Sequence, residues 1–177
     1  MSVKVAIVED DSGIRESLSI LINGSPTFRC IATHANAESA LQHLPYDWPD
    51  VLLMDINLPK MSGIDCAVKL KEVKPNLQII MLTVYTDNDL IFKSLMAGAS
   101  GYLLKQTPPS EILDAIVDVH RGGSPMTNSI ARKVVQFFQQ RGLKSEPENL
   151  SKREQEILGL LAKGHQYKEI ADALDLS

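Results

Sequence analysis

The stretch that decides the fold is Asp50-Val51-Leu52-Leu53-Met54-Asp55-Ile56-Asn57-Leu58-Pro59. The apolar run from Val51 to Met54, between an acidic start and a proline-containing exit, predicts a strand buried on both faces of a parallel sheet. Asp55 then lies at the carboxyl end of this strand. In open α/β sheets ligands bind outside the carboxyl ends of the strands, so the Asp55 carboxylate is expected at a binding crevice. The same residues also suit a plain strand-terminating turn.

Apolar runs and helical periodicities alternate on both sides of this strand. Five strands alternating with five helices predict an α/β, doubly wound domain over residues 3–121. The flavodoxin-like strand order 2-1-3-4-5 is the common arrangement at this size. Strands are predicted at 3–8, 28–33, 51–54, 78–83 and 102–105. The first helix is predicted to end at Asn23-Gly24, and the next four are predicted to begin at Asn36, Ser62-Gly63, Asp87 and Ser110.

In this strand order, polar side chains from four strand ends meet at one edge of the sheet. Glu9 and Asp10 follow the first strand, Asp55 the third, Thr83 ends the fourth and Lys105 the fifth. Two carboxylates about 4 Å apart repel by about 4 kcal/mol at an effective dielectric constant near 20, so a cation is expected among them. An all-oxygen site with few carboxylates suits Mg²⁺.

Such an edge suggests phosphoryl chemistry. Lys105 supplies a positive point charge suited to a phosphoryl oxygen, and Thr83 supplies a hydroxyl group. A carboxylate beside Mg²⁺ and a lysine is a plausible nucleophile that would form an aspartyl phosphate. The alternative is a structural acidic cluster neutralised by one lysine.

Residues 3–121 resemble a response regulator receiver domain. The order and spacing of four segments carry this resemblance: Val8-Glu9-Asp10, Leu53 to Pro59 with Met61-Ser62-Gly63, Leu82-Thr83, and Ala97 to Lys105. The resemblance implies that a sensor histidine kinase donates a phosphoryl group to the chain. By the same resemblance, Asp55 is the phosphoacceptor, Mg²⁺ is held by Glu9, Asp10, Asp55 and the backbone carbonyl of Asn57, Lys105 contacts the phosphoryl group, and Thr83 and Tyr102 are the switch pair.

Phosphorylation is expected to act as a two-state switch. The phosphate adds about −1.5 to −2 charges, and Thr83 would move toward it while Tyr102 repacks. We expect the face built by the fourth and fifth helices and the fifth strand to change, and the chain to form a homodimer on activation. Glu9 replaces the more frequent Asp of the family, which should alter metal affinity more than metal identity. Bulky Tyr85 is a candidate gate that shields the acyl phosphate from water.

Residues 122–149 form a predicted connector. Gly122-Gly123-Ser124-Pro125 ends the receiver, and an amphipathic helix is predicted from about Asn128 to Gln140. This helix has too little core to fold alone, so it either packs on a neighbouring domain or serves dimerisation or signal coupling. Residues 142–149 are predicted to be a flexible linker.

Residues 150–177 predict a partial all-α helix-turn-helix. Ser151 and Glu154 form a capping box that opens one helix, Gly164 ends it, and a second short helix follows. The pattern is similar to the LuxR-type helix-turn-helix of NarL/FixJ regulators, and the chain stops where the family's recognition helix would begin. Base reading needs that helix in the major groove, so specific DNA binding is expected of the complete parent and not of this 177-residue chain.

The composition of the chain bears on its cellular location, the state of its cysteines and its binding to nucleic acid. The longest apolar runs fall short of a membrane span, and acidic residues come too early for a signal peptide, so a cytoplasmic protein without membrane contact is expected. Cys30 and Cys66 have no paired spacing and read as reduced thiols. Residues 1–121 carry 10 Lys and Arg against 15 Asp and Glu, which argues against nucleic-acid binding by this segment.

Three functions remain open. The leading one is a phosphorylation-activated, DNA-binding transcriptional response regulator. The second is a receiver-only phospho-switch interaction protein, if the natural chain ends at Ser177. The third, a phosphotransferase or phosphatase acting on small molecules, is weak because no general acid or further catalytic carboxylate is evident. The chain is therefore not expected to be an enzyme beyond its own phosphorylation and dephosphorylation.

Overall fold

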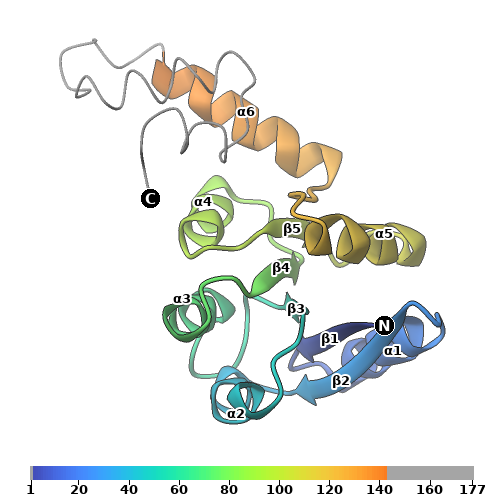
Figure 1. Ribbon diagram of the computed structural model, residues 1–177. Helices are drawn as coiled ribbons and strands as arrows, with labels where there is room; N and C mark the ends of the chain where they lie inside the picture. The colour runs from blue at the N-terminus through green and yellow to red at the C-terminus, as the bar shows by residue number, and fades with distance from the viewer. Residues whose placement is uncertain (1, 143–177) are drawn as a thin grey trace, which may run out of the picture. The chain divides into compact units, whose positions relative to one another are not determined.

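The computed structural model describes residues 2–142. Its centre is a five-stranded parallel sheet with the order β2-β1-β3-β4-β5 (Figure 1). This confirms the predicted flavodoxin-like arrangement. The strands are β1 Val3–Val8, β2 Phe28–His34, β3 Val51–Met54, β4 Gln78–Thr83 and β5 Gly101–Leu104.

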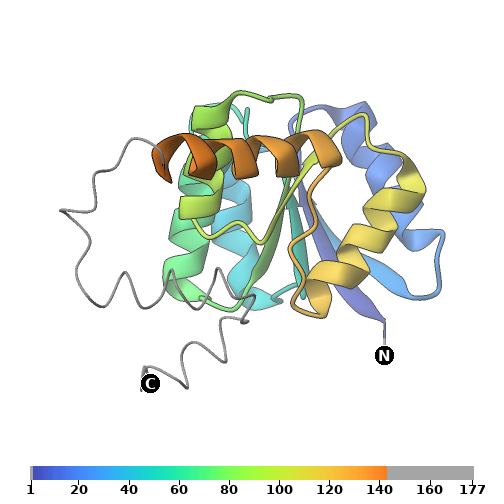
Figure 2. The ribbon, with the colours of Figure 1, turned by 90° about the horizontal axis from the view of Figure 1, so that it is seen from above.

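Helices cover both faces of the sheet. Figure 2 shows α1 and α5 on one side of the strands and α2, α3 and α4 on the other. The helices are α1 Ser12–Asn23, α2 Ala37–His43, α3 Gly63–Val73, α4 Asn88–Met96, α5 Pro109–His120 and α6 Asn128–Gly142, and η1 Leu44–Tyr46 is a single 3₁₀ turn. No helix among residues 2–142 combines the length and the hydropathy that crossing a bilayer requires.

Each central strand is buried on both faces, as the unbroken apolar runs predict. Val5 and Leu53 face the side of α1 and α5, whereas Ala6 and Leu52 face the side of α2, α3 and α4. Successive side chains of a strand point to opposite faces, so one run such as Val51–Met54 supplies both halves of the core.

The predicted starts of α2, α3 and α4 agree with the observed caps, whereas α5 begins at Pro109, one residue before the predicted Ser110, and has no side-chain cap. The side chains of Asn36, Ser62 and Asp87 each accept a hydrogen bond from a backbone N–H in the first turn of the following helix. These bonds satisfy donors that have no partner within the helix. The sequence therefore determines where α2, α3 and α4 begin.

Some boundaries differ by one or two residues from those predicted. The second strand continues to His34, and the fifth runs from Gly101 to Leu104, so Lys105 lies just past its end. The turn η1 was not predicted. Helix α6 extends two residues beyond Gln140, through Gly142, which had been assigned to the linker. The rest of that linker and the predicted helix-turn-helix at 150–177 lie outside the described residues.

Candidate functional site

The strand ends bring the predicted site residues to one edge of the sheet. β1 and β3 are adjacent, with Val8 paired to Met54, so Glu9 and Asp55 leave the sheet side by side. The backbone N–H of Asp55 donates to the carbonyl of Val8 at 2.9 Å. On the other side of β3, the backbone N–H of Lys105 donates to the carbonyl of Thr83 at 2.9 Å.

Glu9, Asp10 and Asp55 form an acidic pocket at this edge. One carboxylate oxygen from each residue lies within 4.8 Å of the other two. Glu9 and Asp55 are 2% and 4% exposed, whereas Asp10 is exposed. Buried oxygens of like charge with one side open to solvent are the kind of arrangement in which Mg²⁺ binds in proteins.

Lys105 bridges the two buried carboxylates. Its Nζ lies 2.8 Å from Oδ2 of Asp55 and 2.7 Å from Oε2 of Glu9. Burial alone would lower the pKa of Lys105, but its hydrogen bonds to Asp55 and Glu9 and their negative charges outweigh burial and raise it. The ammonium group is therefore fully charged at neutral pH and holds Asp55 and Glu9 together.

The carboxyl group of Glu9 is buried beside Lys105. Burial raises the pKa of Glu9, and the Lys105 contact offsets only part of that effect. An acid whose pKa is raised on folding contributes stability below its ordinary pKa, and this contribution is lost as the pH rises through the raised value. Burial therefore disfavours the ionised form of Glu9, and a cation bound at the pocket would favour it.

The turn between β1 and α1 is fixed by Arg15, a residue that the sequence analysis missed. Its Nη1 donates to the carbonyl of Glu9 at 2.7 Å and to that of Asp10 at 3.0 Å. The backbone N–H of Asp11 also donates to Oε1 of Glu9 at 3.2 Å. The signal in the sequence was an arginine one turn into the helix that follows the three acidic residues Glu9, Asp10 and Asp11.

The orientation of Asp55 is set by its own chain and by α3. The backbone N–H of Ile56 donates to Oδ1 of Asp55 at 2.7 Å, which leaves Oδ2 toward Lys105. The backbone N–H of Gly63 donates to the carbonyl of Ile56 at 2.9 Å. A Cβ at Gly63 would lie 1.8 Å from the carbonyl oxygen of Asp55, so only glycine allows this approach.

The two predicted switch residues, Thr83 at the end of β4 and Tyr102 in β5, are both buried. The Thr83 hydroxyl is fully buried and has no hydrogen-bond partner among the described residues. The Tyr102 side chain is also fully buried, and its hydroxyl donates to the carbonyl of Tyr85 at 3.0 Å. Burial raises the pKa of Tyr102, assisted by the charges of Asp87 and Asp55, so its hydroxyl stays a donor.

Two further predicted site residues are Tyr85 and Asn57. The Tyr85 side chain is half-buried and packs against the core on the side of α2, α3 and α4, while its carbonyl receives the Tyr102 hydroxyl. Asn57 lies exposed in the turn two residues after Asp55. The gate role of Tyr85 and the ligand role of the Asn57 carbonyl stay predictions.

Comparisons with known proteins agree with this geometry. Residues 5–117 match the response regulator receiver domain, and residues 148–177 match bacterial regulatory proteins of the luxR family. The chain is 34% identical over 182 residues to oxygen regulatory protein NreC of Staphylococcus carnosus strain TM300, covering 99% of this chain and 84% of that protein.

Solved structures share the fold. A two-component response regulator of the LuxR family from Aurantimonas sp. SI85-9A1 superposes with a TM-score of 0.73 at 27% identity, covering 77% of this chain and 97% of that one. The isolated REC domain of RcsB from Salmonella enterica serovar Typhimurium, in the presence of phosphomimetic BeF3⁻, gives a TM-score of 0.69. It covers 75% of this chain and 99% of that one, and its 20% identity supports the fold alone.

The two matched segments bear on two of the functions left open by the sequence, the DNA-binding response regulator and the receiver-only interaction protein. The luxR-family match at residues 148–177 does not favour a receiver-only interaction protein. The chain belongs to the response regulator family, and it is a phosphorylation-activated, DNA-binding response regulator with a receiver domain followed by a LuxR-type helix-turn-helix segment.

Proposed function

We propose that Asp55 is the phosphoacceptor of this response regulator. A carboxylate oxygen of Asp55 attacks the phosphorus of a phosphohistidine on a sensor histidine kinase. The new O–P bond forms as the P–N bond breaks, and the electron pair stays on the imidazole nitrogen. The observation that carries this proposal is the position of Lys105, whose Nζ lies 2.8 Å from Oδ2 of a carboxylate that is 4% exposed. That ammonium group can stabilise a phosphoryl group on Asp55.

The acidic pocket fits Mg²⁺. Three carboxylates offer oxygens within 4.8 Å of one another, and hard oxygen ligands with room for waters and phosphate oxygens are what this cation requires. Glu9, Asp10, Asp55 and the carbonyl of Asn57 would hold it. When bound, the cation neutralises negative charge on the transferring phosphoryl group. Lys105 remains available to contact a different phosphoryl oxygen.

The response to phosphorylation would begin at Thr83. Its buried hydroxyl lacks a partner among the described residues, and a phosphoryl oxygen on Asp55 would supply an acceptor. Movement of Thr83 would change the packing of Tyr102, because β4 and β5 are adjacent strands.

We further propose that the chain forms a homodimer on activation, and that its catalysis is limited to its own phosphorylation and dephosphorylation. Cytoplasmic location stays a prediction.

The phosphoacceptor is tested by intact mass after incubation with acetyl phosphate and Mg²⁺. We expect one phosphoryl adduct on the wild-type chain and none without Mg²⁺. Asp55→Asn should give no adduct, because the amide lacks the nucleophilic oxygen, whereas exposed Asp65→Asn in α3 should behave like the wild type. An adduct that persists in folded Asp55→Asn would refute the assignment.

The gate role of Tyr85 makes a separate prediction. If the half-buried side chain of Tyr85 limits water at the acyl phosphate, Tyr85→Ala should lose the phosphoryl adduct several-fold faster than the wild type. Val84→Ala, at the neighbouring exposed position, is the control and should decay at the wild-type rate. Decay is followed by intact mass after removal of acetyl phosphate, and equal rates in both variants would exclude the gate.

A further inference from the structure

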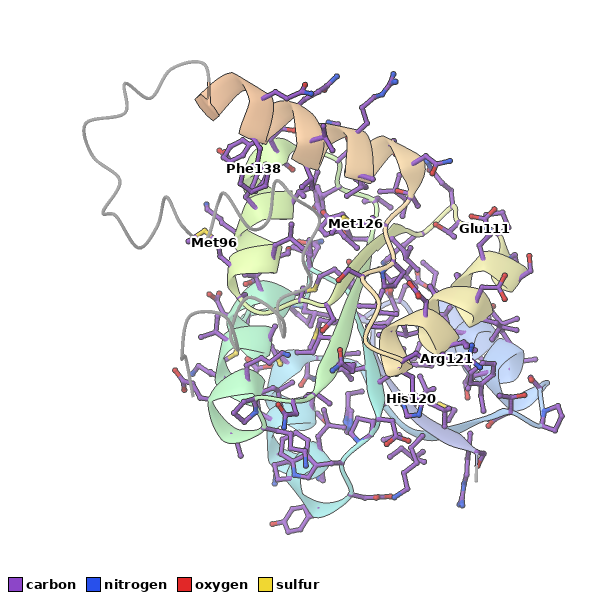
Figure 3. All side chains as sticks on the ribbon, turned by 45° about the horizontal axis from the view of Figure 1, so that its top comes forward. Met96, Glu111, His120, Arg121, Met126 and Phe138 are labelled. Atoms are coloured by element: carbon purple, nitrogen blue, oxygen red, sulfur yellow. The ribbon has the colours of Figure 1, made fainter. Side chains whose placement is uncertain are left out.

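A cavity of about 230 Å³ lies between α5 and the connector residues 122–127 that follow it. The backbone N–H of Tyr102 in β5 donates to the carbonyl of Pro125 at 2.9 Å, and the carbonyl of Tyr102 accepts from the backbone N–H of Thr127 at 3.4 Å. These bonds fix the connector against β5. Figure 3 shows the connector, with Met126, running back alongside α5, which carries Glu111 near its start. The cavity therefore has a helix as one wall and a fixed segment as the other.

The helix wall carries a row of three carboxylates. Glu111, Asp114 and Asp118 all line the cavity and are exposed. Residues three or four positions apart lie on one face of a helix, with about 5–6 Å between their Cβ atoms. A Cβ at Gly123 would lie 2.5 Å from Cγ of Asp118, so the Asp118 side chain packs against the connector. Within residues 2–142 none of the three carboxylates forms a salt bridge or a side-chain hydrogen bond, so this part of the chain does not neutralise them.

A buried hydroxyl group adds a hydrogen-bond acceptor to the same cavity. Thr107, just before α5, lines the cavity and is 6% exposed. Its hydroxyl has no hydrogen-bond partner among the described residues. Leaving a buried polar group without a partner costs free energy, and a hydroxyl oxygen can accept from an ammonium N–H. A ligand that carries such a donor would therefore satisfy Thr107.

The row of carboxylates is too extended for a single metal ion. Among residues 2–142, the acidic pocket at Asp55 is the one group of three such side chains whose ligand atoms all lie within 4.8 Å of one another. Carboxylates spread along a helix suit several cationic groups in a line instead. The cavity is also lined by apolar side chains, among them Leu103 and Ala115, which suit methylene groups between those cations.

We propose that this cavity binds a linear aliphatic triamine. Ammonium groups separated by three or four methylenes repeat at about the spacing of the carboxylates along α5, and one of them would donate to the hydroxyl of Thr107. The cavity is smaller than the roughly 300–1,000 Å³ of pockets for drug-sized ligands, which favours a thin chain over a folded segment of a partner protein. None of its lining residues belongs to the acidic pocket, so binding here does not require phosphorylation of Asp55.

Titration of the full ¹⁵N-labelled chain with spermidine, followed by NMR, tests this site. Saturating Mg²⁺ occupies the acidic pocket, and an ionic strength of about 0.15 M screens weak surface attraction. We expect the largest shifts at the amides of the residues that line the cavity. The double variant Glu111→Gln/Asp114→Asn should bind spermidine about tenfold more weakly, as expected for loss of two exposed ion pairs. The double variant Asp65→Asn/Glu72→Gln removes the same charge from exposed positions of α3 and should match the wild type.

Two further measurements separate a shaped site from attraction by charge alone. Thr107→Val should bind spermidine several-fold more weakly without a lower urea midpoint, because the lost hydroxyl has no partner in the free chain. Hexaamminecobalt(III), a compact ion with the same charge as spermidine, should bind more weakly than spermidine. Equal affinity for the two cations, tighter binding of a trilysine peptide, or equal affinity of the two double variants for spermidine would overturn the site, as would an absence of shifts at the cavity in the wild type.

Discussion

Gly63→Ala is expected to destabilise the receiver by about 3 kcal/mol or more, the upper range for overpacking a rigid site. The added Cβ would lie 1.8 Å from the carbonyl oxygen and 2.8 Å from the carbonyl carbon of Asp55. These are backbone atoms, so no rotamer change relieves the clash. Either α3 moves away from β3, which breaks the Gly63 to Ile56 hydrogen bond, or Asp55 moves away from Lys105.

Urea unfolding and intact mass together measure this effect. Gly63→Ala should show a lower unfolding midpoint and, where still folded, a phosphoryl adduct far below the wild-type amount. Gly13→Ala is the matched control, since its Cβ would meet only a side-chain oxygen of Asp11 at 3.3 Å, at an exposed position of α1. Wild-type stability in Gly63→Ala would show that α3 does not hold Asp55 in place.

Lys105→Met is expected to impair both the chemistry and the stability of the pocket. Removing the ammonium group takes away the charge beside Oδ2 of Asp55, and loss of one such electrostatic contact typically slows a reaction about 100-fold. It also leaves the buried carboxylates of Glu9 and Asp55 without their shared partner. Breaking a buried ion pair from one side costs about 3 kcal/mol, and Mg²⁺ should restore part of this stability.

The pH dependence distinguishes loss of charge from loss of packing. The pKa of Lys105 is raised on folding, so its stabilising effect is complete below the ordinary lysine pKa of about 10.4 and is lost as the pH rises through the raised value. The difference in unfolding free energy between wild type and Lys105→Met should therefore shrink at strongly alkaline pH. Lys93→Met, which removes a positive charge from an exposed position of α4, is the control variant. A pH-independent difference would mean that packing alone is lost.

The sequence by itself determined the order of the strands along the chain, the starts of three helices and the convergence of the site residues at one edge of the sheet. Apolar runs such as Val51–Met54 can only be satisfied by burial on both faces, and a parallel sheet brings the carboxyl ends of its strands to one edge. The positions of Glu9, Asp55, Thr83 and Lys105 after their strands therefore predict that they lie at one edge of the sheet. Local capping chemistry at Asn36, Ser62 and Asp87 likewise located three helices.

Only the tertiary structure decided which atoms share which partners. The contact of Lys105 with Glu9 joins residues 96 positions apart, and the contact of Lys133 with Thr86 joins residues 47 positions apart. Such contacts produce no periodic pattern in the sequence, because they depend on how whole helices and strands pack. The same reason hid the need for glycine at position 63, since its neighbour is the backbone of another segment. Local sequence patterns thus predicted which residues form the site, and long-range packing set the distances and hydrogen bonds between them.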